Sequence, residues 1–246
     1  MSCCTAQAPD PTFAQKVIDF NAHLVFDAPL PQGISVMNPF RDNACAVPAS
    51  TAFYRKYYDD HRPRRIILGI NPGRFGAGLT GIPFTDPKRL AERCHIHVDA
   101  CPSAHEPSSV FVYEVIAALG GEYAFYRDWY INSICPLGFT STGKNGRQTN
   151  FNYYDRSALQ RAAYPFIVES LRRQLAFGIR RDVCFCFGTG KNAAFLEKLN
   201  AEYAFFDSIV PLEHPRYIVQ YKWKARQTYV EKSVSLLGKY KSESSE

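Results

Sequence analysis

The segment Ile66-Ile67-Leu68-Gly69-Ile70-Asn71-Pro72-Gly73-Arg74-Phe75-Gly76 passes from an apolar run into a turn rich in glycine and proline, and continues through Thr80-Gly81-Ile82-Pro83-Phe84. An apolar run that ends in such a turn indicates a buried strand that delivers a rigid loop to the edge of a sheet. Sites of α/β proteins lie at that edge. Glycines let the backbone approach a ligand closely, and the amide of Asn71 offers a hydrogen-bond donor and an acceptor. The segment therefore predicts a binding loop.

Three further apolar runs predict buried strands at 129–134, 183–187 and 208–212. Helical patterns separate the strands. We expect helices at 12–24 with Thr12 as N-cap, from a cap at Ser108-Ser109 to Gly120-Gly121, at 157–177 with an interruption near Pro165, at 193–199 and at 225–237. Strands that alternate with helices predict an α/β three-layer sandwich, in which helices cover both faces of a central four-stranded parallel sheet.

Length and composition narrow the class of protein. The chain has 246 residues and is 46% hydrophobic, which predicts one domain spanning 1–246 with a disordered charged tail at 239–246. The formal charge of +6 suits a polyanionic partner without demanding one. No segment is apolar enough to cross a bilayer, and no targeting leader is evident, so we expect a cytoplasmic protein without a membrane partner.

The eight cysteines show no paired spacing of metal ligands. We expect free thiols in a reducing compartment and no metal, although the pattern alone does not exclude an iron–sulfur cluster.

Four polar motifs follow the four predicted strands. Asn71 follows the first strand, Asn132 ends the second, Gly188 follows the third, and His214-Pro215 follows the fourth. The carboxyl ends of parallel strands share one edge, so these residues are expected to converge on one crevice. Each also has a purely structural interpretation, as a turn residue, a cap or a satisfied histidine.

Two segments suggest contact with phosphate. Gly188-Thr189-Gly190-Lys191 opens a helix after a strand, but it lacks the Walker pattern, because Phe185 and Asn192 replace the required glycine and hydroxyl residue. Segment 216–226, which includes Arg216, Tyr217 and Lys222, interleaves four cations with three large aromatics. This composition suits nucleic acid, although an exposed basic helix start would look the same.

Together these motifs resemble the single-strand-selective monofunctional (SMUG) branch of the uracil-DNA glycosylase superfamily, in a bacterial form. Gly69–Gly76 with Thr80–Phe84 resembles the branch's first motif, Gly-Met-Asn-Pro-Gly continuing to Thr-Gly-Val-Pro-Phe. Asn132 ahead of Cys135-Pro136-Leu137 resembles its uracil-reading asparagine, and His214-Pro215 resembles the start of its second motif. The chain departs from the pattern at Ile70, at Arg74 and at Arg216-Tyr217, and segments 99–107 and 140–152 do not align with the family.

The resemblance implies a hydrolase for base-excision repair, which flips uracil or a related damaged base out of DNA and leaves an abasic site. Asn71 would position water and His214 would stabilise the uracil anion. Phe84, Asn132, Gly73 and Ile70 would surround the base, whereas Gly188, Gly190, Lys191, Arg216, Tyr217 and Lys222 would hold DNA. A monomer without cofactor or metal, nucleoid-associated in a bacterium, is expected. The alternatives are a phosphate- or nucleotide-binding protein that uses the Gly188–Gly190 turn, and an inactive nucleic-acid-binding module.

Overall fold

The central sheet consists of four parallel strands: β2 (Arg64–Gly69), β3 (Trp129–Ser133), β6 (Ile179–Phe187) and β7 (Ile209–Leu212), in the order β3-β2-β6-β7. The computed structural model describes residues 10–143 and 146–241. The side chains of Ile66, Ile67 and Leu68 in β2 are almost fully buried, as a parallel strand covered on both faces requires. The predicted α/β fold and its four-stranded parallel sheet are confirmed.

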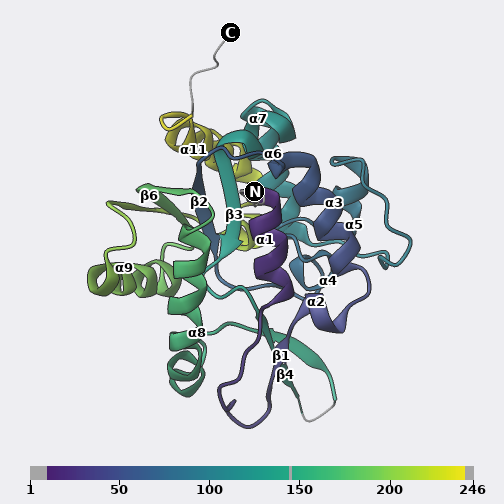
Figure 1. Ribbon diagram of the computed structural model, residues 1–246, viewed down its shortest axis with the longest axis vertical. Helices are drawn as coiled ribbons and strands as arrows, with labels where there is room; N and C mark the ends of the chain where they lie inside the picture. The colour runs from purple at the N-terminus through teal and green to yellow at the C-terminus, as the bar shows by residue number, and fades with distance from the viewer. Residues whose placement is uncertain (1–9, 144–145, 242–246) are drawn as a thin grey trace, which may run out of the picture.

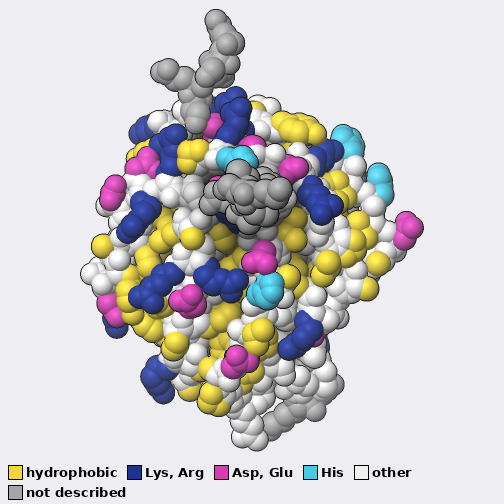
Figure 2. Space-filling view, in the orientation of Figure 1, with side chains coloured by type: hydrophobic (Ala, Val, Ile, Leu, Met, Phe, Trp, Pro, Cys, Tyr) yellow, Lys and Arg dark blue, Asp and Glu magenta, His cyan; other side chains and the backbone are white. Residues whose placement is uncertain are grey.

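Helices lie on both sides of this sheet. In Figure 1, α9 (Lys191–Tyr203) lies to the left of the strands and α8 (Ser157–Leu175) below them, while α3 (Ala46–Tyr58), α5 (Pro87–Glu92) and α6 (Pro107–Ala118) lie to the right. The other described helices are α1 (Phe13–Ala22), α2 (Pro39–Asp42), α4 (Ala77–Thr80), α7 (Gly121–Asp128), α10 (Pro215–Tyr221), the 3-10 turn η1 (Trp223–Ala225) and α11 (Arg226–Gly238). Figure 2 shows one face, on which Lys and Arg side chains are spread among acidic and hydrophobic ones.

A second sheet, which the sequence did not predict, is antiparallel. It joins β1 (Ile34–Met37), β4 (Gly138–Thr142) and β5 (Gln148–Phe151) in the order β1-β4-β5. Gln148, Thr149 and Asn150 of β5 are polar and exposed, so the strand lacks the apolar run that identifies a buried strand. This sheet matters for the site because the chain leaving β5 contacts Asn71.

Helix boundaries agree with the sequence in some places and differ in others. Thr12 caps α1 as expected, and Gln15 completes a capping box with it. Ser108 and Ser109 do not cap α6. They lie inside its first turn, after Glu106 as the N-cap and Pro107 at the first helical position.

Two further expectations concern the continuity of the chain, and the one for α8 is wrong. Helix α8 runs through Pro165 without interruption, because Leu159, Ala163, Ile167 and other buried residues along it pack into the core. Residues 239–241 of the expected disordered tail are placed: the ring of Tyr240 packs against Phe185, and its carbonyl accepts a hydrogen bond from Arg65 at 2.6 Å. Residues 242–246 lie outside the described residues.

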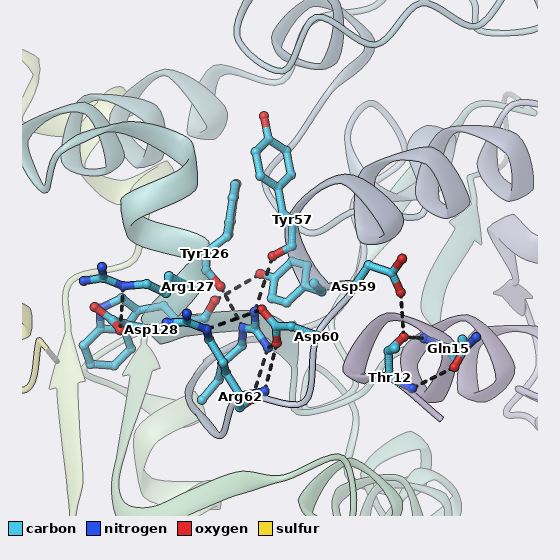
Figure 3. Close-up of polar contacts among 12 residues, drawn as sticks. Thr12, Gln15, Tyr57, Asp59, Asp60, Arg62, Tyr126, Arg127 and Asp128 are labelled. Atoms are coloured by element: carbon cyan, nitrogen blue, oxygen red, sulfur yellow. Dashed lines mark hydrogen bonds and ion pairs between the residues drawn. The ribbon is translucent and has the colours of Figure 1, made fainter. Parts of the chain in front are cut away.

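Arg64 joins three elements at the start of β2. Its guanidinium is fully buried and donates to both carboxylate oxygens of Asp60, at 2.8 and 2.9 Å. It also donates to the carbonyls of Tyr57 and Tyr126, which lie near the ends of α3 and α7. Figure 3 labels Asp60, Tyr57 and Tyr126. Every face of the buried cation is thus hydrogen-bonded or covered by the rings of Phe13 and Tyr58.

The cysteines differ from expectation at one pair. Cys45 at the start of α3 and Cys101 form a disulfide, with their Cα atoms 4.6 Å apart. Cys94, Cys135, Cys184 and Cys186 are buried free thiols, and burial raises the pKa of Cys135 to about 12. Within residues 10–143 and 146–241, no three His, Cys, Asp or Glu side chains are grouped to hold a metal ion. No described helix is long and apolar enough to cross a membrane.

Candidate active site

A cavity of about 130 Å³ opens at the carboxyl edge of the parallel sheet. Its walls come from the turn after β2, the segment before α6, the end of β3, the chain around β5 and the start of α10. Six residues predicted from the sequence line it together: Ile70, Asn71, Gly73, Phe84, His214 and Arg216. The expected convergence of distant motifs on one crevice is therefore found for these six.

Asn71 is held by the chain that leaves β5. Its Nδ2 donates to the carbonyl of Phe151 at 3.3 Å, and its Oδ1 accepts from the backbone N–H of Tyr153 at 3.2 Å. Both ends of the amide are therefore tied to one backbone segment. Its orientation depends on the small antiparallel sheet.

Phe84 adopts a left-handed backbone conformation, with φ of 55°, which a bulky side chain rarely takes. The ring stands edge-on to Phe187, with centroids 5.1 Å apart, and lies 5.9 Å from the ring of His214. A Cβ at residue 69 would come within 3.1 Å of the Phe84 ring, so Gly69 leaves space for it. Backbone strain at a residue that faces a cavity is typical of functional sites.

His214 is the N-cap of α10, and its Nδ1 accepts a hydrogen bond from the backbone N–H of Arg216 at 3.1 Å. Because Nδ1 is an acceptor, the neutral ring carries its proton on Nε2. Burial, and then the positive charge of Arg216, lower the pKa of His214 to about 4. The ring is therefore neutral at physiological pH and offers Nε2–H as a donor.

Asn132, at the end of β3, is not among the residues that line the cavity, and its role in binding the base stays a prediction. Its Nδ2 donates to the Tyr130 hydroxyl at 2.6 Å, and its Oδ1 accepts from the backbone N–H of Ser133. Successive side chains of a strand point to opposite faces, and it is Ser133 that lines the cavity.

A second recess, of about 290 Å³, adjoins the cavity and shares Ile70 and His214 with it. The predicted DNA-contacting residues Gly188, Gly190, Lys191 and Tyr217 line this recess. Gly188 has a φ of 114°, which favours glycine there. Lys222, at the end of α10, is exposed and lines neither space.

Sequence reasoning missed Glu106, Asn150 and Asn152, which also line the cavity. All three come from the segments that did not align with a family motif. The pKa of Glu106 is raised to about 7 by burial first and by the charge of Asp86 second, while Arg216 opposes the shift. No local pattern around Glu106 distinguished it from a surface acid.

Two comparisons with known proteins bear on the family of the chain. Residues 55–238 match the family model of the uracil DNA glycosylase superfamily. The chain is also similar to wild-type SMUG2 of Pedobacter heparinus, known from a crystal structure, with 55% sequence identity over 92% of this chain and 97% of that one and a TM-score of 0.90. No curated protein matched the sequence, and neither match supports the nucleotide-binding alternative. The chain belongs to the uracil DNA glycosylase superfamily.

Proposed function

We propose that this protein is a monofunctional DNA glycosylase, a single-domain enzyme that flips uracil out of DNA and hydrolyses its N-glycosidic bond. One observation carries the proposal: the fixed amide of Asn71 and the neutral, Nε2-protonated ring of His214 line one cavity beside Phe84. Flipping costs a few kcal/mol and exposes the C1′–N1 bond to these groups.

His214 would act on the leaving base. As the C1′–N1 bond breaks, its electron pair moves to uracil, and the negative charge collects on O2. A preorganised donor aimed at such an oxygen supplies roughly 3–4 kcal/mol. Because the ring is neutral at physiological pH, it donates a hydrogen bond through Nε2–H and keeps its proton.

Asn71 would position the water that attacks C1′. An amide has no useful basicity near neutral pH, so it can only orient the water by hydrogen bonding. This role requires an oriented amide, and the contacts of Asn71 with Phe151 and Tyr153 supply the orientation.

The base itself would lie against Phe84, with Ile70 and Gly73 along the wall of the cavity. At the end of β3, Ser133 rather than Asn132 would supply the hydrogen bond to the base, because only Ser133 of the two lines the cavity. A hydroxyl both donates and accepts, so this contact alone does not select uracil over other deaminated bases.

DNA phosphates would contact Gly188, Gly190 and Lys191, together with Arg216, Tyr217 and Lys222. No lysine in the described part of the chain lines the main cavity, which suits an enzyme that forms no Schiff base and leaves an abasic site. Every group invoked comes from one chain, so we propose a monomer that acts at the nucleoid.

The test is base release from an end-labelled oligonucleotide with one uracil, single-stranded or paired, followed by alkali. Wild-type protein is expected to yield cleavage only after alkali. His214→Ala and Asn71→Ala should each lower the single-turnover rate roughly 10²-fold or more, and Ser133→Ala about tenfold, as the loss of one hydrogen bond predicts. Circular dichroism checks folding. Full activity in both the His214 and the Asn71 variant would refute the assigned mechanism.

A further inference from the structure

The roles proposed for His214 and Asn71 assign no side chain to accept the proton of the attacking water. Water that attacks C1′ must lose a proton, and the amide of Asn71 cannot take it. Among the described residues that line the cavity, Glu106 is the only acid.

The backbone at Glu106 is fixed by a buried carboxylate. Asp86 is fully buried, and its Oδ2 accepts from the N–H of Glu106 at 2.6 Å and from the hydroxyl of Ser109 at 3.0 Å. The same oxygen lies 3.0 Å from Nδ1 of His105. Asp86 therefore holds the start of α6, and Glu106 with it, at the rim of the cavity.

The Glu106 carboxylate lies over the turn that carries Asn71. A Cβ at residue 76 would come within 2.0 Å of its Oε2, and one at residue 73 within 3.2 Å of its Oε1. Gly76 and Gly73 thus leave the space that the carboxylate occupies. Among the described residues, none donates a hydrogen bond to Oε1 or Oε2 of Glu106. Both oxygens can therefore accept a hydrogen bond or a proton from a ligand.

The charged residues around Glu106 have opposite effects on the pKa of its carboxyl group. Asp86 faces it from the loop before α5, and Arg216 faces it from α10. His105 precedes it on the same segment, and Arg74 and Arg147 line the recess on its outer side. Burial and Asp86 raise the pKa of Glu106 to about 7. The carboxylate form is thus accessible at neutral pH, and its conjugate acid is stable, as a proton acceptor requires.

We propose that Glu106 is a catalytic residue that accepts the proton of the attacking water. The C1′–N1 bond breaks and its electron pair leaves with the base, which His214 stabilises. A lone pair of the water oxygen then forms the C1′–O bond, and one water proton passes to the Glu106 carboxylate. The carboxylic acid afterwards returns this proton to solvent or to the base anion. This inference rests on the proposed glycosylase function.

The test uses the full chain and the uracil oligonucleotide at limiting substrate, where the pH profile reports the free enzyme. For wild type, kcat/KM should rise about tenfold per pH unit below 7 and level off above it. In Glu106→Gln, kcat/KM should be lower than in wild type by roughly 10²-fold or more at pH 8. It should also be independent of pH between 5.5 and 8, while the variant keeps its affinity for the oligonucleotide. Formate should partly restore Glu106→Ala. Glu197→Gln, an exposed acid on α9, is the matched control.

Each result separates this inference from the proposed function. A wild type without base release refutes the function itself. An active wild type with a flat profile between pH 5.5 and 8 overturns only the role of Glu106, whether or not the variants fold. A Glu106→Gln variant that keeps wild-type activity, or loses activity but keeps the wild-type profile, overturns it as well.

Discussion

His214 has a pKa of about 4 in the folded protein, below its ordinary value of 6.5. The folded state therefore binds fewer protons than the unfolded state between these pH values, so protonation favours unfolding there. Above pH 6.5 the ring is neutral in both states, and its titration does not change the free energy of unfolding. As the pH falls from 6.5 toward 4, this titration lowers the free energy of unfolding by a growing amount. At pH 4.5 the amount should reach about 2.5 kcal/mol, since one pKa unit corresponds to 1.36 kcal/mol.

Urea unfolding of wild type and His214→Gln at pH 7.5 and 4.5 measures this amount. The wild type should lose about 2.5 kcal/mol more unfolding free energy than the variant between the two pH values. Glu106 is present in both proteins, so its own titration cancels in the comparison. His61→Gln, which changes an exposed histidine before β2, is the control. Identical pH dependence in wild type and His214→Gln would show that the ring is not buried as a neutral donor.

At the scale of single residues, the sequence predicted those cavity residues that carry a local signal. Asn71, Phe84 and His214 stand in motifs whose glycines and prolines identify a turn at a strand end. Ser133 lines the cavity and Asn132 does not, a difference that the motif could not reveal, because a shift of one residue along a strand reverses the face that a side chain takes. Glu106 was missed because its position depends on Asp86, a contact that no local pattern encodes.

At the scale of elements, Arg64 ties α3, β2 and α7 together through one buried guanidinium. Replacing it with methionine keeps most of the apolar stem but removes every hydrogen bond. The carbonyls of Tyr57 and Tyr126 would then lose their bond to the guanidinium, while the carboxylate of Asp60 would keep only its contacts with Arg62. We expect Arg64→Met to lower the unfolding free energy by about 2–3 kcal/mol, because hydrogen bonds to a charged group each contribute roughly 1.5–3 kcal/mol and the Asp60 side chain, which is 37% exposed, stays in contact with water.

Chemical denaturation at pH 7 tests this, with Arg41→Met as the matched control. Arg41 also bonds an aspartate, Asp42, but the pair is exposed and should contribute no more than about 1 kcal/mol. A loss of similar size in both variants would contradict the structural role assigned to Arg64.

The elements also show where sequence patterns stop being informative. Each of the four parallel strands contains an apolar run, so all four were predictable, although β6 also carries the exposed and charged Arg180, Arg181 and Asp182 after its first residue. The hairpin of β4 and β5 is short and polar, and its pairing with β1 spans about a hundred residues, so no window of sequence contains the interaction that stabilises it. Helix α8 passes Pro165 because its buried face compensates for the hydrogen bond that proline cannot make.

At the scale of the whole molecule, the net charge of +6 does not reveal where DNA binds, and the face in Figure 2 carries cations and acids intermixed. The sheet offers a better guide, because the cavity and the second recess lie at its carboxyl edge. Lys191 is the first residue of α9 and Lys222 directly follows α10; both are exposed, and both helices begin at this edge, whereas Arg180 is exposed near the opposite end of β6. Of these three cations, Lys191 and Lys222 should contact phosphates and Arg180 should not.

Fluorescence anisotropy with a uracil-free duplex, titrated at several salt concentrations, tests this arrangement. Lys191→Ala and Lys222→Ala should each weaken binding and reduce the slope of log K against log salt by roughly 0.9, the loss of one phosphate contact. Arg180→Ala should leave the slope unchanged, although it removes the same charge. Because phosphate contacts position DNA without joining the reaction, the single-turnover rate at saturating protein should stay near that of wild type in all three variants. Equal slopes for the three variants would mean that net charge, rather than the carboxyl edge of the sheet, governs binding.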